Sequence, residues 1–148
     1  MTDTLMPERA WLVVVSAEHA GHAVEQQMIQ INDGRRGNLT RLSRGDGIVL
    51  YSPTDRFRDK KPLRAFTALG LIADEQPYQA EPMNMGPRGV IAPWRRRIDY
   101  LDAHPLALSS VTDDLHLTQD RNWGYRMRFG LAPLPPEDFV HLHAAMTR

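Results

Sequence analysis

Aromatic and arginine side chains are the groups in this sequence best suited to bind a flat heterocycle. Sixteen arginines stand against two lysines, although acidic and basic residues balance to a formal net charge of zero. A guanidinium group stacks on aromatic rings and forms paired hydrogen bonds with phosphates or base edges, so the excess of arginine suits a nucleic-acid partner. GC-rich coding, which favours arginine codons, explains the same excess without any function. The positions of the residues must decide between these interpretations.

Trp123 is the first candidate for a stacking residue. It falls in a predicted loop and precedes Gly124, which lets a ligand approach the backbone closely. A tryptophan that fills the hydrophobic core would give the same pattern, and the residues alone leave both interpretations open. Trp11 and Trp94 fall within predicted strands, where packing in the core is favoured.

Polar groups gather at the ends of two predicted strands. Residues 51–53 end a buried strand in a sharp turn, which brings a phenol and a hydroxyl to the rim of the sheet. Residues 16–19 join another strand to a helix whose free amide groups could meet a base carbonyl or a phosphate. A proline turn and a serine helix cap explain these positions without any ligand. The candidates at the two ends are Tyr51, Ser52, Pro53, Ser16, Ala17 and His19.

The run Arg95-Arg96-Arg97 lies in a predicted strand, so Arg95 and Arg97 share one face and Arg96 lies on the other. We expect at least one of them to face inward, where it must be paired by Asp99, another acid or a ligand; a structural ion pair is the favoured explanation. The arginines that could follow a phosphate backbone are Arg35, Arg36, Arg41, Arg44, Arg126 and Arg128, although a solvated surface explains most of them singly.

The sequence offers little for catalysis, and we expect neither an enzyme nor a cofactor. It has no cysteine, which excludes disulfides, thiolate metal sites and thiol nucleophiles. His19 and His22 are three residues apart, but no defined metal-ligand signature surrounds them. A glycine-rich phosphate loop and a nucleophile elbow are both absent from the sequence. A triad assembled in space round Ser16 or Ser52 stays open.

Length and hydropathy favour one domain in the cytoplasm. The 148 residues suit a single domain with an ordinary core, and no linker or repeat divides them. No apolar run is long enough for a signal peptide or a membrane helix. We therefore expect no membrane partner, and a monomer is the favoured state.

Hydrophobic periodicity predicts an α+β fold with about six strands. Strands are expected over residues 10–16, 48–51, 63–73, 94–101 and 125–134, with residues 79–83 pairing with the third of these. Gly70 suggests a bulge or a close backbone approach. Helices are expected over 17–31 and from Pro135 to Met146, with a charged loop over 56–61, a loop over 85–93 and a short helix or irregular turn over 106–115.

Five segments of this sequence resemble the EVE domain, a family of the PUA-like group. They are residues 11–19 (WLVVVSAEH), 30–53 (QINDGRRGNLTRLSRGDGIVLYSP), 66–70 (FTALG), 93–100 (PWRRRIDY) and 122–131 (NWGYRMRFGL). The sequence departs from the family at Ala10, where a second aromatic residue is common, at Asn32-Asp33, where a histidine often precedes Gly34, and at Trp94, where phenylalanine is also common. Small changes in a pocket wall admit or reject single methyl groups, so the departures bear on the ligand rather than the fold.

The resemblance implies a single domain over residues 1–148 with a curled, PUA-like β-barrel flanked by a few helices. It also implies a non-catalytic module that binds a flipped, modified nucleobase, such as a modified cytosine in DNA. An RNA-binding module acting on tRNA or rRNA and a small enzyme acting on a nucleobase or nucleotide are the alternatives. The resemblance favours Trp123 as a pocket residue. The base-binding candidates are Ser16, Ala17, His19, Tyr51, Ser52, Pro53, Trp94, Arg95, Trp123, Gly124 and Arg128, and the phosphate-binding candidates are Arg35, Arg36 and Arg41.

Overall fold

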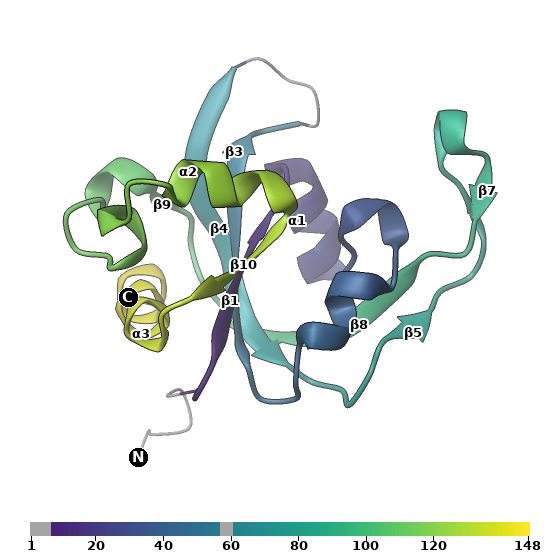
Figure 1. Ribbon diagram of the computed structural model, residues 1–148, viewed down its shortest axis with the longest axis horizontal. Coiled ribbons are helices and arrows are strands. Elements are labelled where there is room, and N and C mark those ends of the chain that lie inside the picture. Colours follow the sequence, from purple (N-terminus) through teal and green to yellow (C-terminus); the bar gives the residue numbers. More distant parts are fainter. Residues whose placement is uncertain (1–6, 57–60) are drawn as a thin grey trace.

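A strongly curled sheet runs through the computed structural model, which describes residues 7–56 and 61–148 (Figure 1). Its main path follows the order β10-β1-β3-β4-β8-β2, and two short strands, β5 and β9, pair with β8 and β4. The bounds are β1 Ala10–Val14, β2 Met28–Ile29, β3 Gly47–Thr54, β4 Pro62–Ile72, β5 Tyr78–Gln79, β8 Trp94–Tyr100, β9 Leu106–Ala107 and β10 Leu131–Leu134. This arrangement confirms the predicted α+β, PUA-like fold.

Strand β1 lies inside the sheet and is covered on both faces, as its apolar run predicts. It pairs in parallel with β3 and antiparallel with β10. Alternate side chains enter opposite cores: Leu12 packs in one hydrophobic cluster, whereas Trp11 and Val13 pack in the other. The sheet therefore separates two cores.

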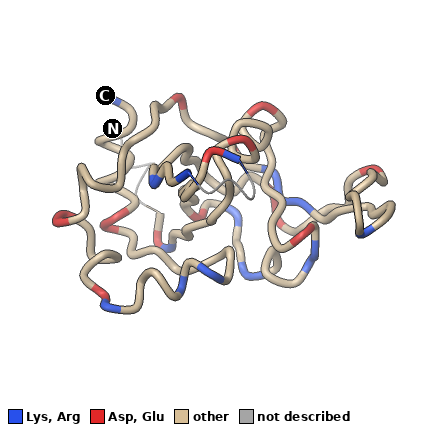
Figure 2. Tube along the Cα trace, turned by 90° about the horizontal axis from the view of Figure 1, so that it is seen from above, with Lys and Arg blue, Asp and Glu red and all other residues tan. Residues whose placement is uncertain are grey.

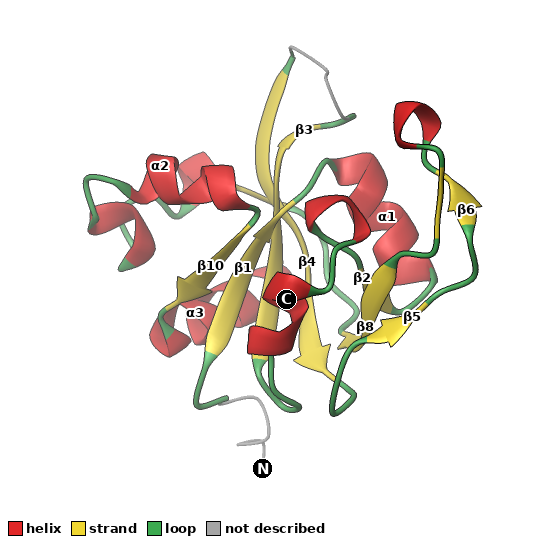
Figure 3. Cartoon of the chain, turned by 45° about the vertical axis from the view of Figure 1, so that its right-hand side comes forward, coloured by secondary structure: helices red, strands yellow, loops and turns green. Residues whose placement is uncertain are grey.

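Helices cover the two faces of the sheet. On one face lies α3 (Pro136–Met146), together with the 3₁₀ turns Leu108–Ser110 and Leu117–Gln119. On the other lies α1 (Ala17–Glu25), with the 3₁₀ turns Asn32–Gly34 and Gly37–Arg41. Figure 3 shows a separate hairpin of β6 (Met83–Asn84) and β7 (Val90–Ile91) standing away from both cores. The predicted closing helix is confirmed.

The helix predicted over 17–31 is too long. It ends at Glu25, because Gln27 adopts a positive φ of 53° that a helix cannot continue through. Residues Met28–Ile29 then form β2, which pairs antiparallel with β8. The apolar spacing at Met28 and Ile31 that suggested a helix reflects burial in the sheet and in the turn after it.

The strand predicted over 125–134 is also wrong in its first half. Residues Trp123–Arg126 form the short helix α2, and Met127–Phe129 form a 3₁₀ turn that ends at Gly130 with φ 78°. The amide groups of Tyr125 and Arg126 both donate to the carbonyl of Asn122, which closes the first turn. Only Leu131–Leu134 is a strand, so Trp123 begins a helix and does not lie in a loop.

Three further boundaries differ from the sequence prediction. Strand β3 continues past Ser52 and Pro53 to Thr54. Pro53 has no amide hydrogen to donate to the neighbouring strand, and the register shift between Ser52 and Thr54 accommodates it. Residues 79–83 do not pair with β4: β5 pairs with β8, and Met83 pairs within the β6–β7 hairpin. The charged loop predicted over 56–61 lies mostly outside the described residues.

Two contacts hold β8 in place, one with β4 and one with the segments beside it. Gly70 faces Tyr100, and a Cβ added there would lie 2.8 Å from the Cα of Tyr100 and would collide with the carbonyl of Asp99, which confirms the predicted close approach. Arg96 is fully buried, which confirms that one arginine of the run faces inward. Its Nε lies 2.6 Å from Oδ1 of Asp74, and its remaining nitrogens donate to the carbonyls of Leu39, Leu42 and Asp74.

Candidate functional site

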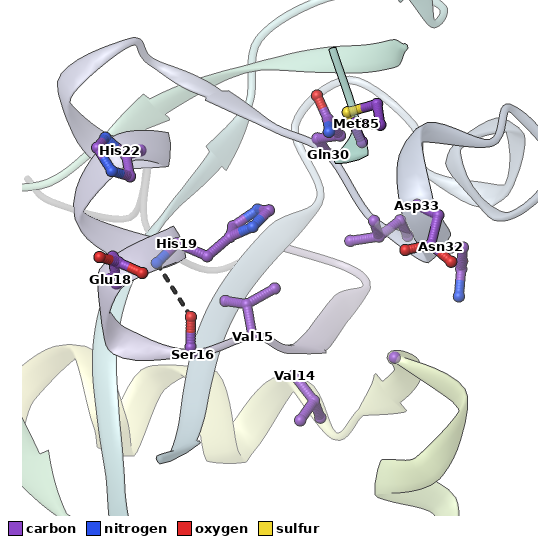
Figure 4. Close-up of a pocket in the computed structure, with 12 residues that line it drawn as sticks. Val14, Val15, Ser16, Glu18, His19, His22, Gln30, Asn32, Asp33 and Met85 are labelled. Atoms are coloured by element: carbon purple, nitrogen blue, oxygen red, sulfur yellow. Dashed lines mark hydrogen bonds between the residues drawn. The ribbon is translucent and has the colours of Figure 1, made fainter. Parts of the chain in front are cut away.

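The junction between β1 and α1 opens onto the first candidate site, a cavity of about 390 Å³ that we call the His19 cavity. Ser16 caps the helix: its hydroxyl accepts a hydrogen bond of 3.2 Å from the backbone amide of His19. The helix start therefore holds His19 at a fixed place. Figure 4 shows its imidazole pointing from α1 into the space between Val15 and Gln30, with Glu18 and His22 further from the centre.

The imidazole of His19 has an unused hydrogen-bonding atom. Its Nε2 is buried and has no partner among the described residues. Burial lowers the pKa of His19 below its ordinary value; a hydrogen bond of the ring with the backbone of Gln30 partly opposes this shift, and the nearby charges of His22 and Arg95 reinforce it. The ring is thus neutral near pH 7. A buried polar atom without a partner is rare in a native fold, and a ligand pairs with this one only after a small shift of the ring or its neighbours, because Nε2 has almost no accessible surface.

The rest of the His19 cavity combines apolar walls with amide groups. Val15 and Ile31 contribute apolar surface. The side chain of Gln30, which is 9% exposed, accepts a 3.0 Å hydrogen bond from Nε of Arg95 and is held in place by it. The other lining residues are Val14, Ser16, Glu18, His22, Asn32, Asp33, Met85 and Gly130. Such a lining offers aliphatic contact and several hydrogen-bonding groups, two carboxylates among them, to a small polar ring.

A second hollow of about 270 Å³, the Trp123 hollow, lies on the other side of Val14. The ring of Tyr51 meets Trp123 edge to face, with centroids 6.4 Å apart and planes at 78°. Burial raises the pKa of Tyr51, although Arg64 opposes this shift, so the phenol stays protonated at neutral pH. The lining residues are Val14, Tyr51, Pro53, Trp123, Gly124, Met127 and Arg128.

The residues that the sequence assigns to one pocket therefore fall into two hollows. Ser16 and His19 line the His19 cavity, whereas Tyr51, Pro53, Trp123, Gly124 and Arg128 line the Trp123 hollow. Val14 contributes to both, so the two hollows are neighbours. The expectation of one aromatic pocket with polar edges is corrected to an aromatic hollow beside a polar cavity.

Four of the predicted base-binding residues line neither hollow. Ala17 is the first residue of α1, between the lining residues Ser16 and Glu18 in the sequence. Ser52 is fully buried, and its hydroxyl forms a 2.8 Å hydrogen bond with that of Thr67, as a structural residue would. Trp94 packs against the core on the α1 face. Arg95 acts on the cavity indirectly, through Gln30.

The predicted phosphate-binding arginines also separate. Arg35, Arg36 and Arg41 are all exposed. Arg36 stacks over the ring of Trp94 at 5.4 Å, and Arg41 stacks over that of Trp11 at 4.9 Å. Arg41 lines a third hollow that Asn32 connects to the His19 cavity. Of the three, Arg41 is therefore best placed beside a candidate site.

Sequence reasoning missed the residues that follow β2. Gln30, Ile31, Asn32 and Asp33 line the His19 cavity, but the prediction placed the first two inside a helix and the others at its end. Asn32 and Asp33 have positive φ values of 49° and 60°, which fold the chain back towards α1. The succession Asn32-Asp33-Gly34 is typical of a tight turn and was the available signal.

Two other features are absent from the part of the chain that the structure describes. No group of three or more histidine, aspartate or glutamate side chains lies where it could hold a metal ion. None of the helices in residues 7–56 and 61–148 is long and apolar enough to cross a membrane.

Comparison with known proteins identifies the class of protein and then the family. The curled sheet with helices on both faces is PUA-like, and the chain belongs to the EVE domain family, whose sequence model matches residues 9–145. A UPF0310 protein of Renibacterium salmoninarum is 40% identical over 137 residues, which cover 93% of this chain and 94% of that protein. The UPF0310 protein YdcG of Bacillus subtilis is 30% identical over 137 residues, covering 92% and 90%.

A solved structure shares the fold alone. A hypothetical protein from Leishmania major superposes with a TM-score of 0.59 at 13% identity, over 93% of each chain. The names of these relatives state no activity. Family membership indicates, at a coarse level, a nucleic-acid-binding module.

Proposed function

We propose that this chain is a single-domain, non-catalytic nucleic-acid-binding module that holds one flipped nucleobase in the His19 cavity. Membership of the EVE domain family supports nucleic-acid binding in general. The observation that carries the finer proposal is the buried Nε2 of His19, which has no hydrogen-bond partner among the described residues. Leaving such an atom unpaired costs free energy, so a ligand that pairs with it binds more tightly than one that does not.

The dimensions and lining of the cavity support a base as its occupant. Its volume of about 390 Å³ falls within the roughly 300–1,000 Å³ range of small-ligand pockets. Val14, Val15 and Ile31 would contact the faces of the ring, and His19 and Gln30 would meet its edge. An enzyme or a binding protein that reads a base out of its stack needs this combination of apolar walls and polar edges.

A modified cytosine in DNA is the first ligand we propose. The apolar part of the wall, to which Met85 contributes, can bury an added methyl group. Each buried carbon is worth about 0.8 kcal/mol, or roughly a fourfold preference over the unmodified base, which would leave that space empty. Discrimination would then depend on the shape of the pocket and on no chemical step.

The proposal assigns no bond-making or bond-breaking role to Ser16 or His19. The hydroxyl of Ser16 is the helix cap, and the group that donates to it is the backbone amide of His19 rather than its imidazole. Such a pair lacks the base-to-nucleophile hydrogen bond that a serine hydrolase uses. We further propose that the module acts as a monomer and that it lies in the cytoplasm. The cytoplasm is a reducing compartment, which suits a chain without cysteine.

Calorimetric titration with free nucleosides tests the proposal. The panel contains cytidine, 5-methylcytidine and 5-hydroxymethylcytidine, each as the ribonucleoside and the deoxyribonucleoside. We expect one modified nucleoside to bind best, and the ribose hydroxyl to separate a DNA ligand from an RNA ligand. Absence of binding across the panel would contradict the proposal. Chromatography of the recovered nucleoside is the control for catalysis, because a converted product would favour the enzyme alternative.

The Trp123 hollow is the second candidate position for the base. One observation favours it: it has aromatic walls, in Tyr51 and Trp123, on which a heterocycle could stack. It offers fewer polar groups than the His19 cavity, and its volume of about 270 Å³ is smaller. Variants of His19 and Trp123 distinguish the two positions.

A further inference from the structure

A third hollow, which we call the arginine groove, lies beside the His19 cavity. Its volume is about 630 Å³, and Arg41, Arg126 and Arg128 line it. Arg41 comes from the 3₁₀ turn before β3, whereas the other two come from α2 and the turn after it. No acidic residue is found among the described residues of its lining. Segments nearly a hundred residues apart thus bring positive charge to one place.

Two of these three guanidinium groups are not neutralised by a carboxylate. Arg126 forms an ion pair of 3.0 Å with Asp120. Arg41 and Arg128 form none within residues 7–56 and 61–148; they stack over the rings of Trp11 and Tyr125 instead. Elsewhere basic and acidic residues are spread over the whole trace (Figure 2). The groove is therefore a local concentration of positive charge on a chain of zero net charge, and it suits an anionic ligand.

Two aromatic rings stand exposed beside these arginines. Tyr125 is 59% exposed and Phe129 is 54% exposed, although both are large apolar side chains. Their centroids are 5.5 Å apart and their planes make an angle of 81°, so the edge-to-face contact between them leaves ring surface open. Exposed rings interleaved with arginine are typical of surfaces on which successive bases of a single strand stack. We call this pair the Tyr125–Phe129 ledge.

The groove adjoins both candidate base sites. Asn32 lines the His19 cavity and the groove, and Arg128 lines the groove and the Trp123 hollow. The rim is held by hydrogen bonds: Nδ2 of Asn32 donates to the carbonyl of Phe129 at 3.3 Å, and Nδ2 of Asn38 donates to Oδ1 of Asn32 at 2.8 Å. A strand that leaves the cavity across Asn32 enters the groove directly.

We infer that the arginine groove and the Tyr125–Phe129 ledge bind the single-stranded segment that flanks the base in the His19 cavity. Phosphates lie against Arg41 and Arg128, and the neighbouring base stacks on Phe129. A single strand fits better than a duplex, because the ledge needs an open base face and a duplex buries its base faces in the stack. This inference rests on the proposed function and deepens it by naming the form of nucleic acid.

Removing the ledge tests the stacking contact. The probe is a short, fluorescently labelled single-stranded DNA with one central 5-methylcytosine, measured by anisotropy. We expect Phe129→Ala to weaken binding about tenfold, in line with the loss of one stacked base. Val90→Ala is the matched control, because Val90 is 73% exposed, lines none of the three hollows and should leave the affinity unchanged. Phe129→Ala should melt like the wild type, since Phe129 lies outside both cores.

Salt dependence tests the phosphate contacts. Each phosphate contact that is lost should reduce the slope of log K against log salt by roughly 0.7 for a single strand. We expect that reduction for Arg41→Gln. Arg44→Gln is the matched control, because Arg44 is also exposed but pairs with Glu75 and does not line the groove.

The outcomes separate this inference from the proposed function. The wild type could bind a free nucleoside while Phe129→Ala and Arg41→Gln bind the strand as tightly as the wild type does. That result contradicts the inference about the groove and leaves the proposal for the base cavity in place. If the two variants lose the strand while no nucleoside binds, the groove stands and the base cavity is wrong. Equal affinity for the strand and its duplex, or no affinity of the wild type for either, overturns the inference.

Discussion

The His19 cavity and the Trp123 hollow share Val14, yet they offer a ligand opposite kinds of surface. The cavity has a volume of about 390 Å³, several amide groups and a buried imidazole nitrogen without a partner. The hollow has a volume of about 270 Å³ and is walled by Tyr51 and Trp123. Polar edges discriminate between similar ligands, because an unmatched ligand leaves them unpaired, whereas flat apolar walls bind most rings alike. We therefore expect selectivity for a bound base to lie on the His19 side.

The two regions also differ in how the fold supports them. The cavity is bounded by β1, by α1 and by the segment after β2, and Arg96 of β8 holds the carbonyls of Leu39 and Leu42 just beyond that segment. Strands β1 and β3 supply Val14, Tyr51 and Pro53 to the hollow, but its remaining wall depends on α2, which spans only Trp123–Arg126, and on the turn after it. A site built on paired strands and a buried ion pair is held more rigidly than one built on a single helical turn. We therefore expect changes to the sheet to affect the cavity first.

The largest expected effect is that of Arg96→Met. Removing the guanidinium leaves Asp74 and two carbonyl groups without their partner, and breaking such a buried pair costs about 3 kcal/mol of the free energy of unfolding. Chemical denaturation measures the loss. Arg97→Met, on the exposed face of the same strand, is the control and should change stability little. A similar loss in both variants would mean that β8 responds to any substitution and that Arg96 has no special role.

The next largest effect is expected for His19→Leu, which keeps the volume of the side chain and removes its hydrogen-bonding atoms. The base would then lose its partner in the cavity at a cost of about 2 kcal/mol, or roughly a thirtyfold loss of nucleoside affinity by calorimetry. His141→Leu is the matched control, because His141 is an exposed histidine on α3 that lines none of the three hollows. Unchanged affinity in His19→Leu would remove the main support for the cavity as the base site.

A smaller effect should follow from pH. Burial lowers the pKa of His19 below the ordinary value of 6.5, so the unfolded chain takes up this proton at a higher pH than the folded chain. The contribution of neutral His19 to the free energy of unfolding is thus fully present above pH 6.5. It is lost as the pH falls from 6.5 through the lower pKa that His19 has in the folded protein. Nucleoside binding that needs neutral His19 should decline over the lower part of this range. Calorimetric titrations at several pH values measure the nucleoside affinity. The affinity of His19→Leu should not change between pH 5 and 8, because this variant lacks the imidazole.

The sequence was sufficient to predict the central strands β1, β3, β4 and β8, but not β2 or the shape of the site. The alternation and apolar run of residues 10–16 correctly placed a strand with two covered faces, and Gly70 correctly indicated a close approach. Arg96 was predictable as an inward-facing arginine because strand alternation opposes it to Arg95 and Arg97. These features depend on local periodicity, which the residues carry themselves.

The division of the site into two hollows depends on backbone conformations that periodicity does not record. The positive φ of Gln27 ended the first helix early and turned residues 30–33 into a cavity wall. The helical turns from Trp123 to Phe129 replaced a predicted strand, so that Trp123 and Phe129 face different hollows. A single positive φ or one turn of helix changes which side chains meet, and neither changes the spacing of apolar residues enough to be predicted.

The smallest expected effect is the sharpest test of the comparison. If the base occupies the His19 cavity, Trp123→Ala should weaken nucleoside binding by at most about threefold, since a neighbouring wall shifts but no contact to the base is lost, whereas direct stacking is worth about 1–3 kcal/mol. Calorimetry beside His19→Leu measures both, and Trp123→Phe, which keeps a flat ring, is the control for the helix. The protein should stay folded by circular dichroism, because Trp123 is only partly buried against its core. Trp123→Ala could instead lose more nucleoside affinity than His19→Leu, while Trp123→Phe binds as the wild type does. That result would place the base in the Trp123 hollow and reverse the assignment of the two hollows.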